Sequence, residues 1–174
     1  MNITFKSLQK SHFPLLLKWL KTPHIKAWWD QGLKWTKKLI QEKYGNYVYG
    51  YKLENNIPKK IHAFIIEIDE QPIGYIQVYD AYDFHRSVPL KNLPKSLAAF
   101  DIFIGQKEYL NKGIGSKVIK LFLESFCKGK YKYIFVDPDY NNIAAIKAYE
   151  KAGFKKIEEQ PEESKEIWML MSLE

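Results

Sequence analysis

Apolar residues in the first quarter of the chain recur at the spacing of helices. Between Ser11 and Pro23 they repeat at intervals of three and four, with Pro14 near the first turn, which predicts an amphipathic helix that ends before Pro23. The pattern predicts further helical segments over residues 25–29 and about 36–44. The first quarter of the chain is therefore predicted to be helical.

Short apolar runs in the middle of the chain predict strands. Residues 62–68 and 73–79 flank a polar turn at 69–72, which predicts an antiparallel hairpin. Residues 81–96 contain prolines and few apolar pairs, so we expect a loop, and residues 98–104 predict a central strand.

The second half of the chain alternates between helical and strand patterns. One apolar helix face runs over about 113–129, and a short buried strand is predicted at 133–136. Asn141 or Asn142 can cap a further helix through Tyr149.

Two short strands, at 154–158 and 167–171, complete the pattern. This order of helices, hairpin, strands and helices predicts a mixed sheet covered by helices. We expect an α/β fold with one domain over residues 1–174.

Composition narrows the class of protein. Hydrophobic residues make up 46% and charged residues 27%, which is typical of a packed globular chain. The longest aliphatic run is too short to cross a bilayer and no signal segment is evident, so we expect a cytoplasmic protein without a membrane partner. One cysteine, Cys127, and four scattered histidines predict no metal site.

The formal net charge of +7 favours anionic partners. Nucleic acid, an acidic membrane and a phosphorylated cofactor all fit this charge. The lysines are spread along the chain, which argues against a tail that binds nucleic acid.

A glycine-containing segment at 110–116 (Leu-Asn-Lys-Gly-Ile-Gly-Ser) lies between a predicted strand and a predicted helix. Its glycines can turn the backbone and present free N–H groups at the helix N-terminus, a place that binds phosphate. The segment is neither a dinucleotide-binding motif nor a P-loop, because Gly113 is followed by Ile114.

A second segment, residues 142–154, reads Asn-Ile-Ala-Ala-Ile-Lys-Ala-Tyr-Glu-Lys-Ala-Gly-Phe. Together the two segments resemble the acetyl-CoA-binding core of the GNAT superfamily of N-acetyltransferases. That motif reads Arg/Gln-x-x-Gly-x-Gly/Ala and, about thirty residues later, Asn-x-x-Ala-x-x-x-Tyr-x-x-x-Gly-Phe. The second part matches throughout, whereas Leu110 stands where the general family has Arg or Gln.

The flanking residues resemble one branch of this superfamily, the aminoglycoside 6′-N-acetyltransferases, in which a leucine at position 110 is expected. The resemblance is carried by Pro72–Tyr79, the pair Trp28-Trp29, the strand with Asp101, Leu110 before Lys112–Gly115, and Asp137-Pro138 before Asn142.

The resemblance implies the GNAT fold, a mixed and mostly antiparallel sheet with a splayed central strand pair and flanking helices. It also implies acetyl-CoA as co-substrate, with the pantetheine arm on the strand after Asp101 and the pyrophosphate at the glycine turn. The implied cofactor-binding residues are Ile102, Phe103, Ile104, Lys112, Gly113, Ile114, Gly115, Ser116, Asn142 and Ala145.

Acetyl transfer to an amine needs few catalytic groups. The amine must lose a proton, and Asp101 is our candidate base, acting directly or through water. The leaving thiolate accepts a proton, and Tyr149 fits that role by its motif position. Each residue has a plainer interpretation, Asp101 as a solvated strand-edge acid and Tyr149 as a core tyrosine.

An aminoglycoside carries several ammonium groups, so its site is expected to contain carboxylates and aromatic faces. The candidate substrate-binding residues are Trp28, Trp29, Asp30, Tyr79, Asp83, Asp101 and Asp137. Relatives have an acid-rich stretch ahead of the strand with Asp101, whereas residues 87–96 contain Lys91, Lys95 and no acid.

Other interpretations keep the fold and change the partner. The acceptor can be a polyamine, a lysine derivative in siderophore assembly or the amino terminus of a protein. A non-catalytic domain that binds acetyl-CoA or nucleic acid is a further alternative, but the usual RNA-binding signatures are absent. We expect a small-molecule amine as partner, no nucleic acid, and a monomer or homodimer.

Overall fold

The computed structural model describes residues 1–174, which form two compact units. The first unit comprises Met1–Val78 with Ile102–Leu110, and the second comprises Tyr79–Asp101 with Asn111–Glu174. Strands β4 (Gln71–Asp80) and β5 (Leu97–Ile104) each contribute residues to both units. The single domain over 1–174 stays a prediction.

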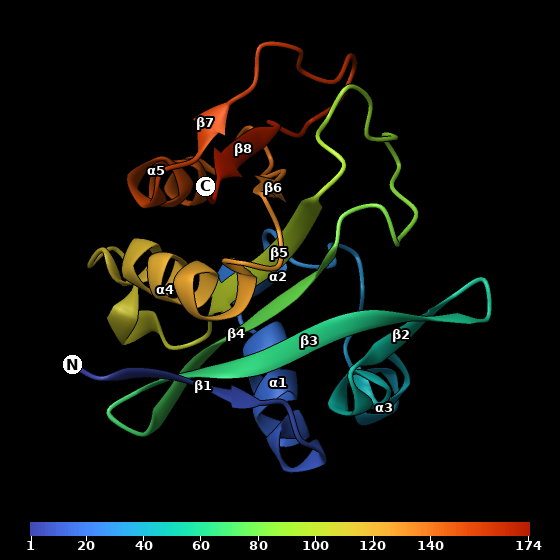
Figure 1. Cartoon of the computed structure of the whole chain (residues 1–174). Coiled ribbons are helices and arrows are strands. Elements are labelled where there is room, and N and C mark those ends of the chain that lie inside the picture. The colour runs from blue at the N-terminus through green and yellow to red at the C-terminus, as the bar shows by residue number, and fades with distance from the viewer. The chain divides into compact units, whose positions relative to one another are not determined.

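In the first unit, four strands lie in the order β1-β3-β4-β5 (Figure 1). Strand β1 (Ile3–Ser7) pairs antiparallel with the second half of β3 (Ile57–Ile68). Strand β2 (Tyr51–Glu54) pairs antiparallel with the first half of β3. The β2–β3 pair is exposed at many positions, whereas residues 63–68 are all buried.

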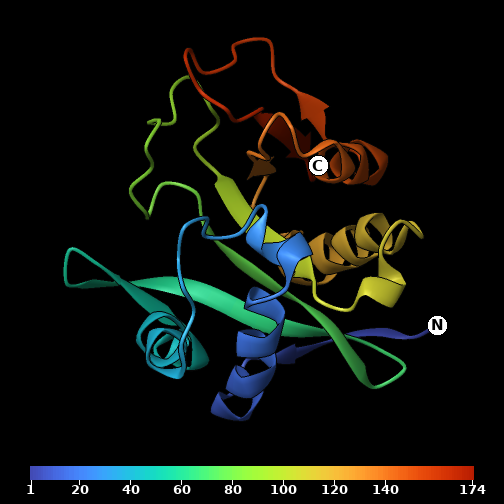
Figure 2. The ribbon, with the colours of Figure 1, turned by 180° about the vertical axis from the view of Figure 1, so that it is seen from behind.

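Helix α1 (Phe13–Leu20) lies across one face of this sheet, as Figure 2 shows from behind. Its buried face includes Leu16 and Trp19, and the ring of Trp19 packs edge-on against Phe103 at 6.0 Å between centroids. The other helices of this unit are α2 (Pro23–Lys26), α3 (Lys37–Tyr44) and the 3₁₀ turns η1 (Lys10–His12), η2 (Tyr47–Tyr49) and η3 (Lys107–Tyr109).

In the second unit, the strands lie in the order β5-β6-β8-β7. Strand β6 (Tyr133–Val136) is parallel to β5 and antiparallel to β8 (Met169–Ser172), which pairs antiparallel with β7 (Lys155–Lys156). Helices α4 (Ile114–Phe122) and α5 (Ile143–Ala152) lie side by side (Figures 1 and 2). This is a mixed α/β architecture, as the sequence predicts.

A π-helical turn, η4 (Leu123–Cys127), follows α4 and brings the lone cysteine into the interior. The Cys127 thiol is buried, and burial raises its pKa to about 12.

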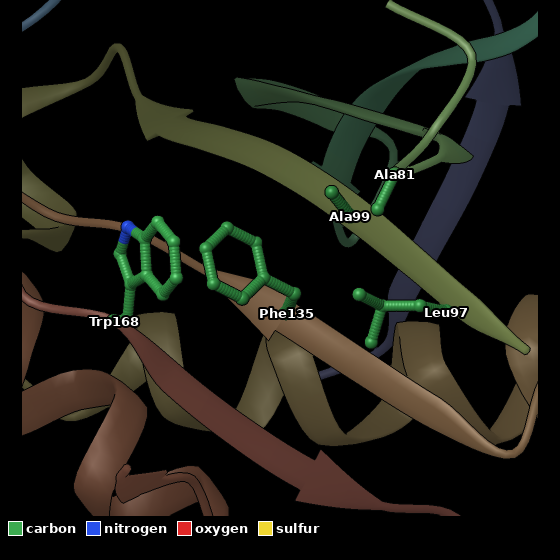
Figure 3. Close-up of a cluster of buried hydrophobic side chains, with 5 residues drawn as sticks. All are labelled: Ala81, Leu97, Ala99, Phe135 and Trp168. Atoms are coloured by element: carbon green, nitrogen blue, oxygen red, sulfur yellow. The ribbon is translucent and has the colours of Figure 1, made fainter. Parts of the chain in front are cut away.

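A buried cluster of five residues forms part of the core of the second unit (Figure 3). The rings of Phe135 and Trp168 meet edge-to-face at 5.6 Å, beside Leu97 on the neighbouring strand. Apolar residues of the segment between β4 and β5, including Val88 and Leu90, pack against this cluster. The segment has no regular structure, as predicted, but its apolar side chains help to fix it.

The parallel pairing of β5 with β6 is short. It joins Leu97 to Tyr133 and ends where Ala99 faces Phe135. Asp101, which is still within β5, and Asp137, which directly follows β6, each lie two residues beyond this last pair. Because side chains alternate along a strand, Asp101 also projects to the same face of β5 as Ala99.

Most predicted elements are confirmed, and several boundaries differ. The first quarter is not wholly helical, because β1 occupies residues 3–7 and α2 ends at Lys26, before Trp28 and Trp29. The predicted hairpin is longer than expected, and the first half of β3 was not predicted. No helix of the structure has both the length and the apolar character that a membrane span requires.

Candidate active site

Tyr79 and Asp101 form a direct hydrogen bond in the second unit. The Tyr79 hydroxyl donates to Oδ2 of Asp101 at 2.9 Å. Burial, followed by the charge of Asp101, raises the pKa of Tyr79 well above its ordinary value, so this hydroxyl remains a donor. The hydrogen bond therefore orients the Asp101 carboxylate.

Asp137 follows β6 and forms an ion pair with Arg86 from the segment between β4 and β5. Nη1 of Arg86 lies 2.6 Å from Oδ2 of Asp137, and the two side chains are 15% and 24% exposed. The guanidinium also lies over the Phe135 ring, 5.1 Å from its centroid. Arg86 is thus held by both a charge and an aromatic face.

The carboxyl of Asp137 is unusual for an acid with an arginine partner. Burial raises its pKa to about 7, in spite of the opposing effect of Arg86, and the charges of Glu166 and Asp101 raise it further. Desolvation and like charge therefore outweigh the ion pair, and the carboxyl titrates near neutral pH.

Tyr149 on α5 belongs to the same electrostatic neighbourhood. Its ring meets Phe100 at 5.8 Å and Phe154 at 5.7 Å. Burial raises the pKa of the phenol far above its ordinary value, and Asp101 and Asp137 raise it further. The hydroxyl stays protonated and is a potential proton donor.

The structure therefore brings together four residues that the sequence singled out, namely Tyr79, Asp101, Asp137 and Tyr149. It adds Arg86 and Glu166, which sequence reasoning missed. An isolated bridge pairs Asp139 with Glu166, and this bridge draws Glu166 toward the end of β6. Both residues are single charged positions in segments without helix or strand periodicity, so the spacing of residues in the sequence did not single out either of them.

Asp83, a further predicted substrate residue, acts on a different group. Its backbone amide donates to the carbonyl of Asp80 at 3.2 Å, and its charge helps to raise the pKa of Tyr131.

Trp28, Trp29 and Asp30 lie in the first unit. Trp28 is 46% exposed, whereas the Trp29 ring packs against Phe103 at 4.9 Å. Asp30 forms an ion pair with Lys43, whose ammonium lies 5.9 Å from the centroid of Trp29. Trp29 and Asp30 therefore have packing and pairing partners within their own unit.

The predicted pantetheine strand, Ile102–Ile104, also lies in the first unit. The Phe103 ring is buried and stacks on Tyr75 at 5.5 Å, and the carbonyl of Ile104 accepts a hydrogen bond from the His24 ring at 3.0 Å. A Cβ at Gly74 would collide with the carbonyl oxygen of Phe103, so the glycine permits close approach of β4 and β5.

The glycine turn forms the N-terminus of α4. Gly113 is the N-cap with φ of 72°, a left-handed conformation that favours glycine, and its carbonyl accepts from the Ser116 hydroxyl at 3.1 Å. The first N–H groups of a helix have no partners within the helix, so those of Ile114, Gly115 and Ser116 are available to an anion.

Two lysines add positive charge to this turn. Lys112 precedes Gly113 and is exposed, and Nζ of Lys151 would lie 3.2 Å from a Cβ at Gly113. Sequence reasoning missed Lys151, which α5 brings to the turn. A helix N-terminus with two ammonium groups has the charge that a phosphate or pyrophosphate requires.

Asn142 and Ala145, the remaining predicted cofactor residues, form a helix cap. Oδ1 of Asn142 accepts from the amide of Ala145 at 3.2 Å at the start of α5. The structure contains no group of three or more His, Cys, Asp or Glu side chains that could hold a metal ion.

An open, mostly antiparallel sheet, a glycine turn at a helix N-terminus, and an acid and a tyrosine beside a short parallel strand pair are the features of a GNAT acyltransferase. The chain belongs to this family: the sequence profile of the acetyltransferase (GNAT) domain matches residues 9–161. It is an acetyl-CoA-dependent N-acetyltransferase.

Known relatives share most of the chain. The aminoglycoside N(6′)-acetyltransferase type 1 of Klebsiella pneumoniae is 26% identical over 157 residues, which cover 89% of this chain and 75% of the relative. The crystal structure of aminoglycoside acetyltransferase AAC(6′)-Ib with coenzyme A is 25% identical with a TM-score of 0.82, covering 98% and 95% of the two chains. Spermidine N-acetyltransferase from Vibrio cholerae, with coenzyme A and spermine, has a TM-score of 0.72 at 18% identity, over 98% and 95%.

The raised pKa of Asp137 predicts a pH-dependent stability. The pKa is 3.8 ordinarily and about 7 in the folded protein, so between these values the folded state holds a proton that the unfolded state has released. The contribution of Asp137 to the free energy of unfolding therefore falls as pH rises from 3.8 to 7 and is level above 7.

We expect the free energy of unfolding of wild type to fall by about 2.5 kcal/mol relative to that of Asp137→Asn between pH 5 and pH 7.5. Urea unfolding of both proteins at the two pH values measures this difference. Equal changes in the two proteins would contradict the raised pKa.

Proposed function

We propose that this enzyme transfers the acetyl group of acetyl-CoA to the 6′-amine of an aminoglycoside. The observation that carries the proposal is the cluster of Tyr79, Asp101 and Asp137, in which a hydrogen-bonded carboxylate lies beside a second acid. Such a cluster attracts an ammonium group and supplies a base for its proton. The aminoglycoside relatives support the same choice of acceptor.

The turn at Gly113 is proposed to hold the pyrophosphate of acetyl-CoA. The N–H groups at the start of α4 and the ammonium groups of Lys112 and Lys151 supply the donors and the positive charge. Ser116 closes the turn through its bond to the Gly113 carbonyl, and Asn142 fixes the start of α5. When bound, acetyl-CoA supplies an activated thioester as acyl donor.

Asp101 is proposed to accept the proton of the acceptor amine, directly or through water. Its hydrogen bond from Tyr79 keeps the carboxylate oriented. Tyr149, which stays protonated at neutral pH, is proposed to give its proton to the leaving thiolate. Burial keeps the phenol protonated, as the role of proton donor requires.

The remaining predicted contacts stay predictions. These are Ile102, Phe103, Ile104 and Ala145 toward the cofactor, and Trp28, Trp29, Asp30 and Asp83 toward the acceptor. The monomer or homodimer and the absence of nucleic acid as partner are predictions as well.

A second candidate keeps the reaction and changes the acceptor to another amine. The ion pair between Arg86 and Asp137 favours it, because one acid of the cluster is already neutralised. A polyamine, a lysine derivative or a protein amino terminus then competes with an aminoglycoside, and a panel of such amines separates the candidates.

The proposed function is tested by the position of the acetyl group. Aminoglycosides of the kanamycin and gentamicin types with a 6′-amine should be acetylated, whereas analogues with a 6′-hydroxyl should not. NMR of the product identifies the modified nitrogen, and an acetyl group on another ring nitrogen would falsify the assignment.

Gly115→Val tests the cofactor site without straining the backbone. The space at Gly115 is open, with Cβ of Ala148 3.9 Å from a new Cβ, so the added side chain fills room for a ligand and leaves the fold intact. We expect acetyl-CoA affinity to fall at least about tenfold by calorimetry, as for a lost charged hydrogen bond. Lys117→Val, on the exposed side of the same helix, should bind like wild type, and unchanged affinity of Gly115→Val would exclude this turn.

Asp101→Asn and Tyr149→Phe together test the two proton transfers. Each should lower kcat by about 10²-fold at pH 7, the lower end of the usual effect of a general acid or base. Raising the pH until the acceptor amine is neutral should restore the rate of Asp101→Asn, because the base is no longer needed, and leave Tyr149→Phe impaired. A normal kcat for Asp101→Asn at pH 7 would move the base to Asp137.

A further inference from the structure

The ion pair of Arg86 and Asp137 places a cation of the protein itself within the acidic cluster. Both side chains are mostly buried, and their charged atoms lie 2.6 Å apart. The acids that act on this pair are Asp101 and Glu166. Arg86 therefore compensates one of three carboxylates.

The segment between β4 and β5 holds Arg86 in this position. The Tyr82 hydroxyl closes the segment by donating to the carbonyls of Pro94 at 2.7 Å and Leu93 at 3.1 Å. The Arg86 guanidinium lies over Phe135, a residue of the buried cluster in Figure 3. These contacts fix the position of the Arg86 side chain, whereas an exposed lysine side chain would be free to move.

A hollow of about 200 Å³ opens beside this segment, and Arg86 contributes to its lining together with Tyr82 and Phe84. All the residues that line it belong to the segment between β4 and β5, so the hollow adjoins Arg86 but is not itself the acidic cluster.

An acceptor with several ammonium groups needs more than one carboxylate. One ammonium can pair with Asp101, but a second that pairs with Asp137 must compete with Arg86. Displacing a mostly buried guanidinium leaves its charge without a partner, which is costly. A singly charged acceptor meets no such competition.

We propose that Arg86 is a specificity-determining residue that retains Asp137 as an internal partner and thereby favours acceptors that bring one ammonium group to the cluster over those that bring several. The inference rests on the proposed function, in that the acceptor amine binds at Asp101. Its consequence is that the enzyme without Arg86 binds polycations more tightly.

The test compares two acceptors that share the reacting ring. One is a kanamycin-type aminoglycoside, and the other is methyl 6-amino-6-deoxyglucoside, which has the equivalent amine as its sole charge. Calorimetry with coenzyme A present measures the Kd of each acceptor at pH 7.5 and at pH 8.5, because loss of Arg86 raises the pKa of Asp137 and a higher pH favours its carboxylate. Steady-state kinetics measures KM.

Arg86→Gln should lower the Kd and KM of the polycation about fivefold to tenfold, as one additional ion pair allows, with the Kd of the single amine changed less than about twofold. Lys91→Gln removes one positive charge from an exposed position of the same segment and should leave the Kd of both acceptors unchanged. The double variant Arg86→Gln/Asp137→Asn should lose the gain, because the released carboxylate is then absent.

Arg86→Met, which keeps apolar packing on Phe135, gives the same comparison if Arg86→Gln does not fold. The inference is overturned if loss of Arg86 leaves the Kd of the polycation unchanged or raises it. It is also overturned if the Kd of both acceptors falls by the same factor, or if the Kd of the polycation falls equally in the double variant. The inference is likewise overturned if neither amine binds to wild type or to any variant.

The proposed function fails separately, when no acetyl group reaches the 6′-amine in wild type or variant. In that case the Kd values still decide the role of Arg86.

Discussion

Two carboxylates just beyond the last pair of the parallel strands β5 and β6 are the constraint on which the candidate site depends. Pairing of β5 with β6 ends at Ala99 and Phe135, and Asp101 and Asp137 each follow two residues later. Burial raises the pKa of the Asp137 carboxyl, and the charges of Glu166 and Asp101 raise it further, so ionising both acids together is unfavourable. The hydrogen bond from Tyr79 and the ion pair with Arg86 are the means by which the fold keeps both acids in place.

Opposite charges are supplied by different kinds of structure. The acids lie on or directly after strands, whose packing against Phe135 and Trp168 leaves them little freedom. The positive groups come from the glycine turn, from the helix that carries Lys151 and from the segment that carries Arg86. The net charge of +7 thus conceals a local excess of acid at the cluster.

The sequence predicted the elements whose periodicity the core enforces and missed those without periodicity. The strand at 133–136 and the helix through Tyr149 are confirmed because buried residues recur there at strand and helix spacing. The first half of β3 was missed because it is polar and largely exposed. Of the site, Asp101 and the glycine turn were found by motif, whereas Arg86 and Lys151 depend on tertiary packing that no local pattern records.

The buried Cys127 has a practical consequence for redox chemistry and labelling. Only the thiolate reacts with disulfides and alkylating reagents, and a thiol with a pKa of about 12 in the interior supplies almost none at neutral pH. The coenzyme A thiol released at each turnover therefore has no reactive protein thiol with which to form a mixed disulfide. A colorimetric thiol reagent added to the folded enzyme counts product without a background from the protein, and a cysteine engineered at the surface becomes its single site of attachment for a probe.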